Sequence, residues 1–209
     1  AYLTEYNPEA ATELLEEAGY KDVDGDGFVE NPDGSQIEFN IRVVNGWTDW
    51  VQTVQMVTEY LEEIGVRSRV EAVDWGVYDG SLKQGNYEAA INWSLLSVDP
   101  IQTYNEYFHT SRIGQIWHAN HGIHAKKVDR WIDEYGQTSD EQRKQEILKE
   151  LQKFTAENLP FVSLFSNPTW FQYNSTRVEG WPTAENPYVH PVWYDAGKRN
   201  ILFNELYTK

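Results

Sequence analysis

The densest group of side chains able to do chemistry is a run of four carboxylates near the N-terminus of the chain. They occupy positions 1, 3, 5 and 9 of an EF-hand-type loop, and they are Asp22, Asp24, Asp26 and Glu30. Carboxylate oxygens at these positions are the ligands that calcium prefers. Position 12 is Asp33 rather than a chelating glutamate, however, and 31–34 has the composition of a tight turn between short strands. A calcium site and a metal-free turn therefore both remain open.

Three histidines spaced three residues apart, His118, His121 and His124, form the second candidate. That spacing could place imidazoles on one face of a helix for zinc binding. Gly122 and the weak helical pattern argue against this arrangement, and no carboxylate recurs at a spacing that would orient the rings. We therefore favour surface or loop histidines over a zinc site.

Motifs for covalent or acid–base catalysis are missing from the sequence. It contains no Gly-x-Ser-x-Gly elbow, no phosphate-cradling glycine loop and no nucleophile beside an obvious base. Thirty-three acidic residues make chance carboxylate pairs unavoidable, and no pair stands out as a glycosidase pair. We predict no catalytic residues and no enzyme activity, with a carbohydrate-active enzyme as the less favoured alternative.

Nine tryptophans point to binding instead, because two of them follow apolar strand patterns. Trp47 comes after the apolar run that starts at Ile41, and Trp93 comes after the run that starts at Tyr87. An indole at a strand end can cover the apolar face of a sugar at little entropic cost, while its N–H still donates a hydrogen bond. Packing in the core is the alternative for any single tryptophan.

Composition excludes several classes of partner. The net charge of −16 and the sequence pI near 4.6 would repel nucleic acid and anionic membranes. Without cysteine the chain has no disulfides or thiolate sites, which leaves its compartment open. The longest uncharged run, 89–98, is too short and too polar to span a bilayer. The first residues lack the features of a targeting segment, so we expect a mature protein or an excised piece of one.

The elements that must position these side chains alternate between strand and helix. The predicted elements are a capped helix from Asn7 to Gly19, strands over 37–43, 66–73 and 87–95, and helices over 50–64 and 78–84. The βαβαβ order predicts an α/β fold with a mixed, mostly parallel sheet flanked by helices. Ligands usually bind at the carboxyl ends of such strands, which selects the loops 45–49 and 93–100. Thr48 or Asp49 could instead simply cap the helix, and Asp99 could simply start a turn.

The second half is less regular, and we expect a loop with short helical turns over 104–123. Helices are predicted over 126–135 and from a capping box at Ser139–Gln142 to about Glu157. Strands are predicted over 161–165 and 169–173, followed by little regular structure until 201–206. No repeat or linker interrupts the chain, so one compact domain is the simplest expectation.

Blocks of sequence that run through most of the chain resemble the family 5 extracellular solute-binding proteins. The blocks are 6–21, 22–34, 61–66, 74–78, 85–91, 159–165 and 177–181. Members of this family are the oligopeptide- and oligosaccharide-binding components of ABC importers. The resemblance implies a two-lobed clamshell of the type II periplasmic-binding-protein kind, of which 1–186 is the C-terminal, ligand-binding lobe. Residues 187–209 would then return toward the missing N-terminal lobe.

The resemblance also implies partners and a compartment. The expected partners are the missing lobe, the membrane permease of an ABC transporter and a ligand, with no nucleic acid. The expected location is extracytoplasmic, in the periplasm or at the cell surface, where the full-length protein could be lipid-anchored. No cofactor is expected apart from the calcium alternative at Asp22, Asp24, Asp26 and Glu30.

The ligand class follows from one departure within the loop 93–100. Peptide-binding members have an aspartate three residues after the tryptophan, which pairs with the amino terminus of the peptide, whereas this chain has Leu96. A neutral, hydroxyl-rich ligand therefore suits the loop better, such as a β-linked cello-, xylo- or manno-oligomer. A peptide is the alternative ligand. The predicted ligand-binding residues are Asn45, Trp47, Asp49, Trp50, Trp93 and Ser94.

Overall fold

The structure is a computed structural model that describes residues 6–95, 97, 99–166, 171–191 and 196–208. By its contacts the chain separates into two compact units, Ala1–Val162 and Ser163–Lys209. The sequence suggested one compact domain because no linker composition marks this boundary.

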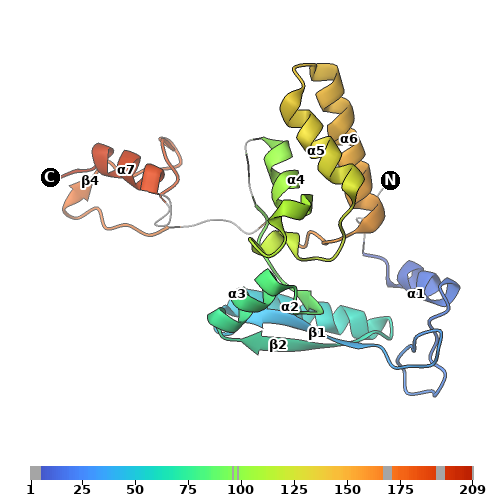
Figure 1. Cartoon of the computed structure of the whole chain (residues 1–209). Helices are drawn as coiled ribbons and strands as arrows, with labels where there is room; N and C mark the ends of the chain where they lie inside the picture. The colour runs from blue at the N-terminus through green and yellow to red at the C-terminus, as the bar shows by residue number, and fades with distance from the viewer. Residues whose placement is uncertain (1–5, 96, 98, 167–170, 192–195, 209) are drawn as a thin grey trace. The chain divides into compact units, whose positions relative to one another are not determined.

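A parallel sheet organises the first part of the first unit (Figure 1). Its strands are β1 (Glu38–Val44), β2 (Arg67–Val73) and β3 (Ala89–Ala90), in the order β2-β1-β3. Helices α2 (Thr48–Glu63) and α3 (Trp75–Gln84) connect them, and β1 pairs with β2 in register from Glu38 opposite Arg67 to Val44 opposite Val73. The predicted α/β fold with a parallel sheet flanked by helices is confirmed.

The third strand is much shorter than predicted. Of the stretch 87–95, only Ala89 and Ala90 pair with β1, and one further bond joins the Ile91 N–H to the Arg42 carbonyl at 3.1 Å. The chain then leaves the sheet, so Trp93 stands in a loop beyond the strand end. The apolar run 87–95 is thus long enough for a strand, but most of it is a loop that carries Trp93 beyond the sheet.

The core of the sheet region forms where apolar side chains of β1 meet those of the two crossover helices. Val43 and Val44 of β1 pack with Val54 of α2 and with Tyr78 and Leu82 of α3. All five side chains are almost completely buried. Strand alternation and helical spacing each place one apolar face toward this contact, which is why both predicted patterns hold here.

Three further helices of the first unit share a second core. They are α4 (Pro100–Phe108), α5 (Lys126–Gln137) and α6 (Glu141–Asn158). Their shared core comprises Tyr107, Phe108, Val128, Ile132, Ile147, Leu151 and Phe154. Helix α1 (Pro8–Glu17) has the predicted cap, because the Asn7 side chain accepts a hydrogen bond from the Ala10 N–H at 2.9 Å.

The expected loop over 104–123 is partly helical. Asp99 does not merely start a turn, because its carboxylate accepts from the Ile101 N–H at 3.2 Å and caps α4, with Pro100 at the first helical position. The predicted short turns then appear as two 3₁₀ helices, η1 (Thr110–Arg112) and η2 (Trp117–Ala119). No helix among the described residues is long and apolar enough to cross a membrane.

The predicted strand over 161–165 is wrong. This segment is irregular, and its apolar side chains Val162, Leu164 and Phe165 are exposed. Of the other predicted strand, residues 169 and 170 lie outside the described part of the chain, and 171–173 form no strand. A strand needs a hydrogen-bonding partner, and the described residues offer none to either segment.

The second unit contains more regular structure than expected. Helix α7 (Ala196–Glu205) begins before the predicted start at 201. A short antiparallel pair joins β4 (Val178–Glu179) to β5 (Tyr207–Thr208) and forms a sheet separate from the parallel one. Three prolines limited the sequence prediction, but they all lie outside these elements.

The cap of α6 differs from the predicted capping box and gives a direct test. Asp140, rather than Ser139, is the cap residue, and its carboxylate accepts from the N–H groups of Gln142 at 2.9 Å and Arg143 at 3.3 Å. We expect Asp140→Ala to lower the free energy of unfolding by about 1 kcal/mol, as for other lost caps. Ser139→Ala should change it by less than about 0.5 kcal/mol. Urea unfolding of both variants measures the difference. A larger loss of stability for Ser139→Ala than for Asp140→Ala would instead support the predicted capping box.

Candidate ligand-binding site

Each strand of the parallel sheet is followed by a tryptophan at its carboxyl end. Trp47 follows β1, Trp75 opens α3 directly after β2, and Trp93 follows β3. Because the carboxyl ends of parallel strands meet at one edge of a sheet, the three indoles converge there. Trp50 from the first turn of α2 and Trp117 from η2 join them. These five residues are called the indole cluster below.

The rings of the indole cluster are in mutual contact. Trp47 stacks on Trp75 with centroids 5.5 Å apart and an interplanar angle of 27°, and Trp75 and Trp93 are close to parallel at 10° and 6.3 Å. Trp50 meets Trp47 edge-on at 4.9 Å, and Trp117 meets Trp93 edge-on at 4.8 Å. These are the separations and angles at which aromatic pairs attract. The cluster is therefore a packed assembly rather than a set of independent side chains.

Exposure divides the cluster into a base and a surface. Trp50 is only 8% exposed and belongs to the core of the sheet region, whereas Trp93 is 36% and Trp75 is 42% exposed. Trp47 and Trp117 are half-buried. The cluster thus offers open indole surface mainly through Trp75 and Trp93, and the buried ring of Trp50 packs against Trp93.

Polar groups that could bond a ligand's hydroxyls surround the indoles. Asn45 and Ser94 are exposed beside Trp47 and Trp93 in the sequence, and Asp49 lies in the exposed first turn of α2. Helix α2 has Trp47 at its cap position without a side-chain cap bond, so neither Thr48 nor Asp49 is the cap.

Ser94 also has a partner in the helical part of the unit. Its hydroxyl interacts with that of Tyr107, which also accepts a hydrogen bond from the Leu95 N–H at 3.3 Å. Burial raises the pKa of Tyr107, so this phenol stays protonated. Leu96, on which the choice of ligand class depends, lies outside the described residues.

Sequence reasoning missed two members of the cluster. Trp75 follows a strand as Trp47 and Trp93 do, so the strand-end rule would have selected it had it been applied to β2. Trp117 lies in a loop without strand or helix periodicity, and only tertiary packing brings it to the cluster. The remaining predicted residues, Asn45, Asp49 and Ser94, lie on the two loops chosen from the sequence.

The three histidines hold backbone carbonyls in place. His118 Nε2 lies 3.0 Å from the Trp93 oxygen, and His121 Nε2 lies 2.8 Å from the Tyr107 oxygen. The two nitrogens of His124 contact the carbonyls of Phe108 and Ala119. The described residues place no carboxylate and histidine group around them that could hold a metal. These contacts agree with the loop interpretation rather than with a zinc site.

Burial of two of these histidines makes stability depend on pH. Desolvation is the main effect that lowers the pKa of His118 and His121, although their carbonyl contacts oppose it. Below their ordinary pKa the unfolded chain binds protons that the folded chain does not, so this stabilisation is complete above about pH 7 and is lost as the pH falls toward 5. We expect the melting temperature to fall over that range.

The matched variant is the double substitution His118→Gln and His121→Gln. It should flatten the dependence of melting temperature on pH between about 7 and 5, whatever its effect on the absolute value. Carboxylates with a lowered pKa, such as Asp26 and Glu134, titrate at lower pH and leave this window unaffected. An unchanged slope in the double variant would contradict the assignment.

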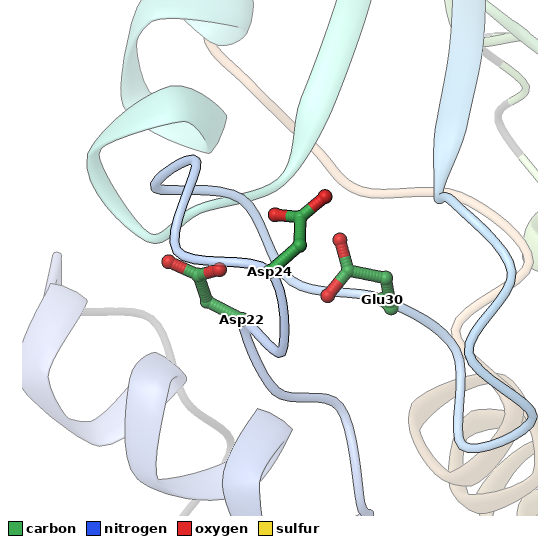
Figure 2. A group of neighbouring side chains, drawn as sticks. All are labelled: Asp22, Asp24 and Glu30. Atoms are coloured by element: carbon green, nitrogen blue, oxygen red, sulfur yellow. The ribbon is translucent and has the colours of Figure 1, made fainter.

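The carboxylate loop lies between α1 and β1, and Figure 2 shows three of its side chains gathered along it. Single oxygens of Asp22, Asp24 and Glu30 lie within 4.8 Å of one another, and Glu30 is 4% exposed. The fourth predicted ligand, Asp26, instead pairs with Arg67 at 2.7 Å, which lowers the pKa of its carboxyl. The calcium site therefore remains a prediction. Three of its four proposed carboxylates, Asp22, Asp24 and Glu30, lie close enough together to bind one ion.

Internal hydrogen bonds hold the same loop without an ion. Asp22 accepts from the N–H groups of Gly25 at 2.6 Å and Gly27 at 2.9 Å. Isolated antiparallel bridges join Lys21 to Glu30 and Glu30 to Gln36, around the turn predicted at 31–34. The turn between short paired segments is confirmed.

Comparison with known proteins identifies the family of this chain. A family model described as bacterial extracellular solute-binding proteins, family 5 middle, matches residues 1–115. The chain belongs to this family. Its members are non-enzymatic transport components, in agreement with the prediction of no enzyme activity.

Two similar proteins illustrate the range of ligands. The oligopeptide-binding protein AppA of Bacillus subtilis is 26% identical over 168 residues, which cover 77% of this chain and 29% of AppA. Its structure with a nonapeptide matches 98% of this chain and 38% of AppA, at 21% identity and a TM-score of 0.67. A mannohexaose-bound periplasmic oligopeptide-binding protein from Thermotoga maritima matches 98% of this chain and 40% of its own, at 26% identity and a TM-score of 0.88. The chain therefore spans well under half the length of these relatives.

Proposed function

We propose that the chain is the C-terminal, ligand-binding lobe of the solute-binding component of an ABC importer, and that its indole cluster binds a β-linked oligosaccharide. The observation that carries the proposal is the convergence of Trp47, Trp75 and Trp93 from three successive strands on one edge of the sheet. Flat pyranose faces stack on exposed indoles, and neighbouring polar groups can bond the equatorial hydroxyls. Cello-, xylo- and manno-oligomers have such faces.

A carbohydrate is favoured over a peptide for two reasons. Leu96 supplies no carboxylate for the charged amino terminus of a peptide, and two of the three exposed polar residues at the site, Asn45 and Ser94, are neutral. The Thermotoga maritima relative, whose fold the chain matches at a TM-score of 0.88, was crystallised with mannohexaose. An oligopeptide is the second candidate, because AppA is named for oligopeptide binding and was crystallised with a nonapeptide.

The mechanism we propose is capture and delivery without chemistry. The lobe 1–186 would close on a second lobe around the ligand, and 187–209 would lead back toward that lobe. Closure of two lobes by a hinge motion would present the loaded form to the membrane permease outside the cytoplasm. Asn45, Asp49 and Ser94 would bond hydroxyls while the indoles stack on the rings.

A titration of tryptophan fluorescence tests the ligand class. We expect cellohexaose, xylohexaose or mannohexaose to change the emission in a saturable way in the full-length protein, and tripeptides and nonapeptides to have no effect. Saturation by peptides alone would replace the carbohydrate with the peptide candidate. Release of new reducing ends during long incubation would instead support the enzyme alternative, and we expect the oligosaccharide to stay intact.

A further inference from the structure

One face of helix α3 carries three residues spaced four apart, Trp75, Asp79 and Lys83, which lie one above the next. The Asp79 carboxylate accepts a hydrogen bond from the indole N–H of Trp117. Lys83 Nζ lies 3.0 Å from the same carboxylate. The ammonium of Lys83 is also 5.7 Å from the centre of the Trp117 ring. Helix α3 thus binds the only atom of the Trp117 side chain that can form a hydrogen bond.

The orientation of Trp117 matters because it contacts both of the more exposed members of the indole cluster. Its ring stands at 88° to Trp75, with centroids 5.5 Å apart, and at 86° to Trp93 at 4.8 Å. Trp75 and Trp93 are themselves within 10° of parallel. A single ring packed edge-on to two parallel rings fixes the angle between them, and rotation of Trp117 would remove both contacts.

The backbone beside Trp117 is held independently. His118 contacts the Trp93 carbonyl at 3.0 Å. The next turn is anchored by Asn120, whose carbonyl accepts from the Tyr87 hydroxyl at 3.1 Å and whose side chain accepts from the Gly114 N–H at 3.0 Å. With the backbone of η2 already fixed, the remaining freedom of Trp117 is rotation of its side chain, and Asp79 is the group that restricts it.

From this geometry we propose that Asp79 is a positioning residue for ligand binding. Its charge-assisted bond to Trp117 keeps the indoles of Trp75 and Trp93 in the parallel arrangement that receives the ligand. A surface ordered in advance loses less side-chain freedom on binding, which strengthens affinity without a new contact. The inference rests on the proposed function for its consequence in binding, but not for its consequence in the free protein.

Two variants of Asp79 separate positioning from simple loss of charge. Asp79→Asn keeps an oxygen that can accept from the Trp117 N–H, whereas Asp79→Leu keeps none. Glu157→Leu is the control. Glu157 pairs with Lys153 on α6, at the same four-residue spacing as Asp79 and Lys83. The variant therefore removes the carboxylate of a similar ion pair that has no indole beside it. Near-ultraviolet circular dichroism reports coupling between the indoles, and oligosaccharide titration reports affinity.

We expect Asp79→Leu to reduce the near-ultraviolet signal. It should also weaken oligosaccharide binding about tenfold, because the indoles of Trp75 and Trp93 would no longer be ordered before the ligand binds. Asp79→Asn should retain most of both, and Glu157→Leu should change neither. An unchanged near-ultraviolet spectrum in Asp79→Leu would overturn the proposal. If the protein binds no oligosaccharide, the proposed function fails while the spectrum still decides the role of Asp79.

A measurement on the unaltered protein covers the case in which Asp79→Leu fails to fold. The indole N–H of Trp117 should exchange with solvent more slowly than that of Trp75, because the carboxylate holds it. Equal, fast exchange of the two signals would overturn the proposal without the use of any variant.

Discussion

Replacing Phe108 with alanine should lower the free energy of unfolding by about 3 to 5 kcal/mol. The side chain is 1% exposed and lies at the end of α4, where it meets Phe154 of α6 edge-on at 5.8 Å and Tyr104 at 6.2 Å. Removing the ring leaves a cavity in the core that the three helices share. Urea unfolding followed by far-ultraviolet circular dichroism measures the loss.

Phe203→Ala is the control for the same deletion at an exposed position. That phenylalanine is 66% exposed on α7 in the second unit, so we expect a change of less than about 0.5 kcal/mol. A comparable loss in both variants would show that the division into a buried and an exposed phenylalanine is wrong.

The second large effect is expected on binding. Trp93→Ala should weaken oligosaccharide affinity about thirtyfold or more, which corresponds to the roughly 2 kcal/mol typical of a central aromatic contact. The residue contacts Trp47, Trp50, Trp75 and Trp117 and keeps an open face, so its removal deletes a stacking surface and loosens the others. Isothermal titration calorimetry of the full-length protein with mannohexaose measures the change.

Tyr60→Ala is the matched control for that variant. Tyr60 is an aromatic residue of α2 with 45% exposure, close to that of Trp93, but it packs against Tyr6 and belongs to no part of the indole cluster. Its loss should leave affinity within about twofold of the unaltered protein. If Tyr60→Ala weakens binding as much as Trp93→Ala, the loss of affinity is not specific to the indole cluster.

Local pattern was sufficient to predict β1 and α2 from the sequence. The alternation from Ile37 to Val43 and the helical spacing from Trp50 to Ile64 both reflect one face turned toward the same core, so each element could be recognised without knowing the other. The turn at 31–34 was predicted correctly for a similar reason, because glycine and asparagine favour turns locally.

Elements whose conformation depends on distant partners were predicted poorly. Residues 161–165 have the composition of a strand, but strand formation requires a partner, and composition carries no information about whether one is present. Helix α4 was missed because its apolar residues, among them Tyr104, Tyr107 and Phe108, are aromatic and follow no polar stripe that would indicate a helix. They become an ordered face only against α5 and α6.

The candidate site shows the same division. The strand-end rule found Trp47 and Trp93, since it depends only on position along the chain. Trp117 and its partner Asp79 come from segments far apart in the sequence, and no spacing relates them. The part of the site that presents open indole surface could be predicted in part, whereas the part that orients it required the structure.

The most direct test of the central claim is to follow the indole N–H signals of ¹⁵N-tryptophan-labelled protein during titration with mannohexaose. The account predicts saturable shifts of the signals from Trp47, Trp75 and Trp93, and no shift of the signal from Trp181, which bonds the Val178 carbonyl in the second unit. Equimolar peptide should shift none of them. Unchanged signals from all three cluster residues at saturating oligosaccharide would contradict the claim that the indole cluster is the ligand-binding surface.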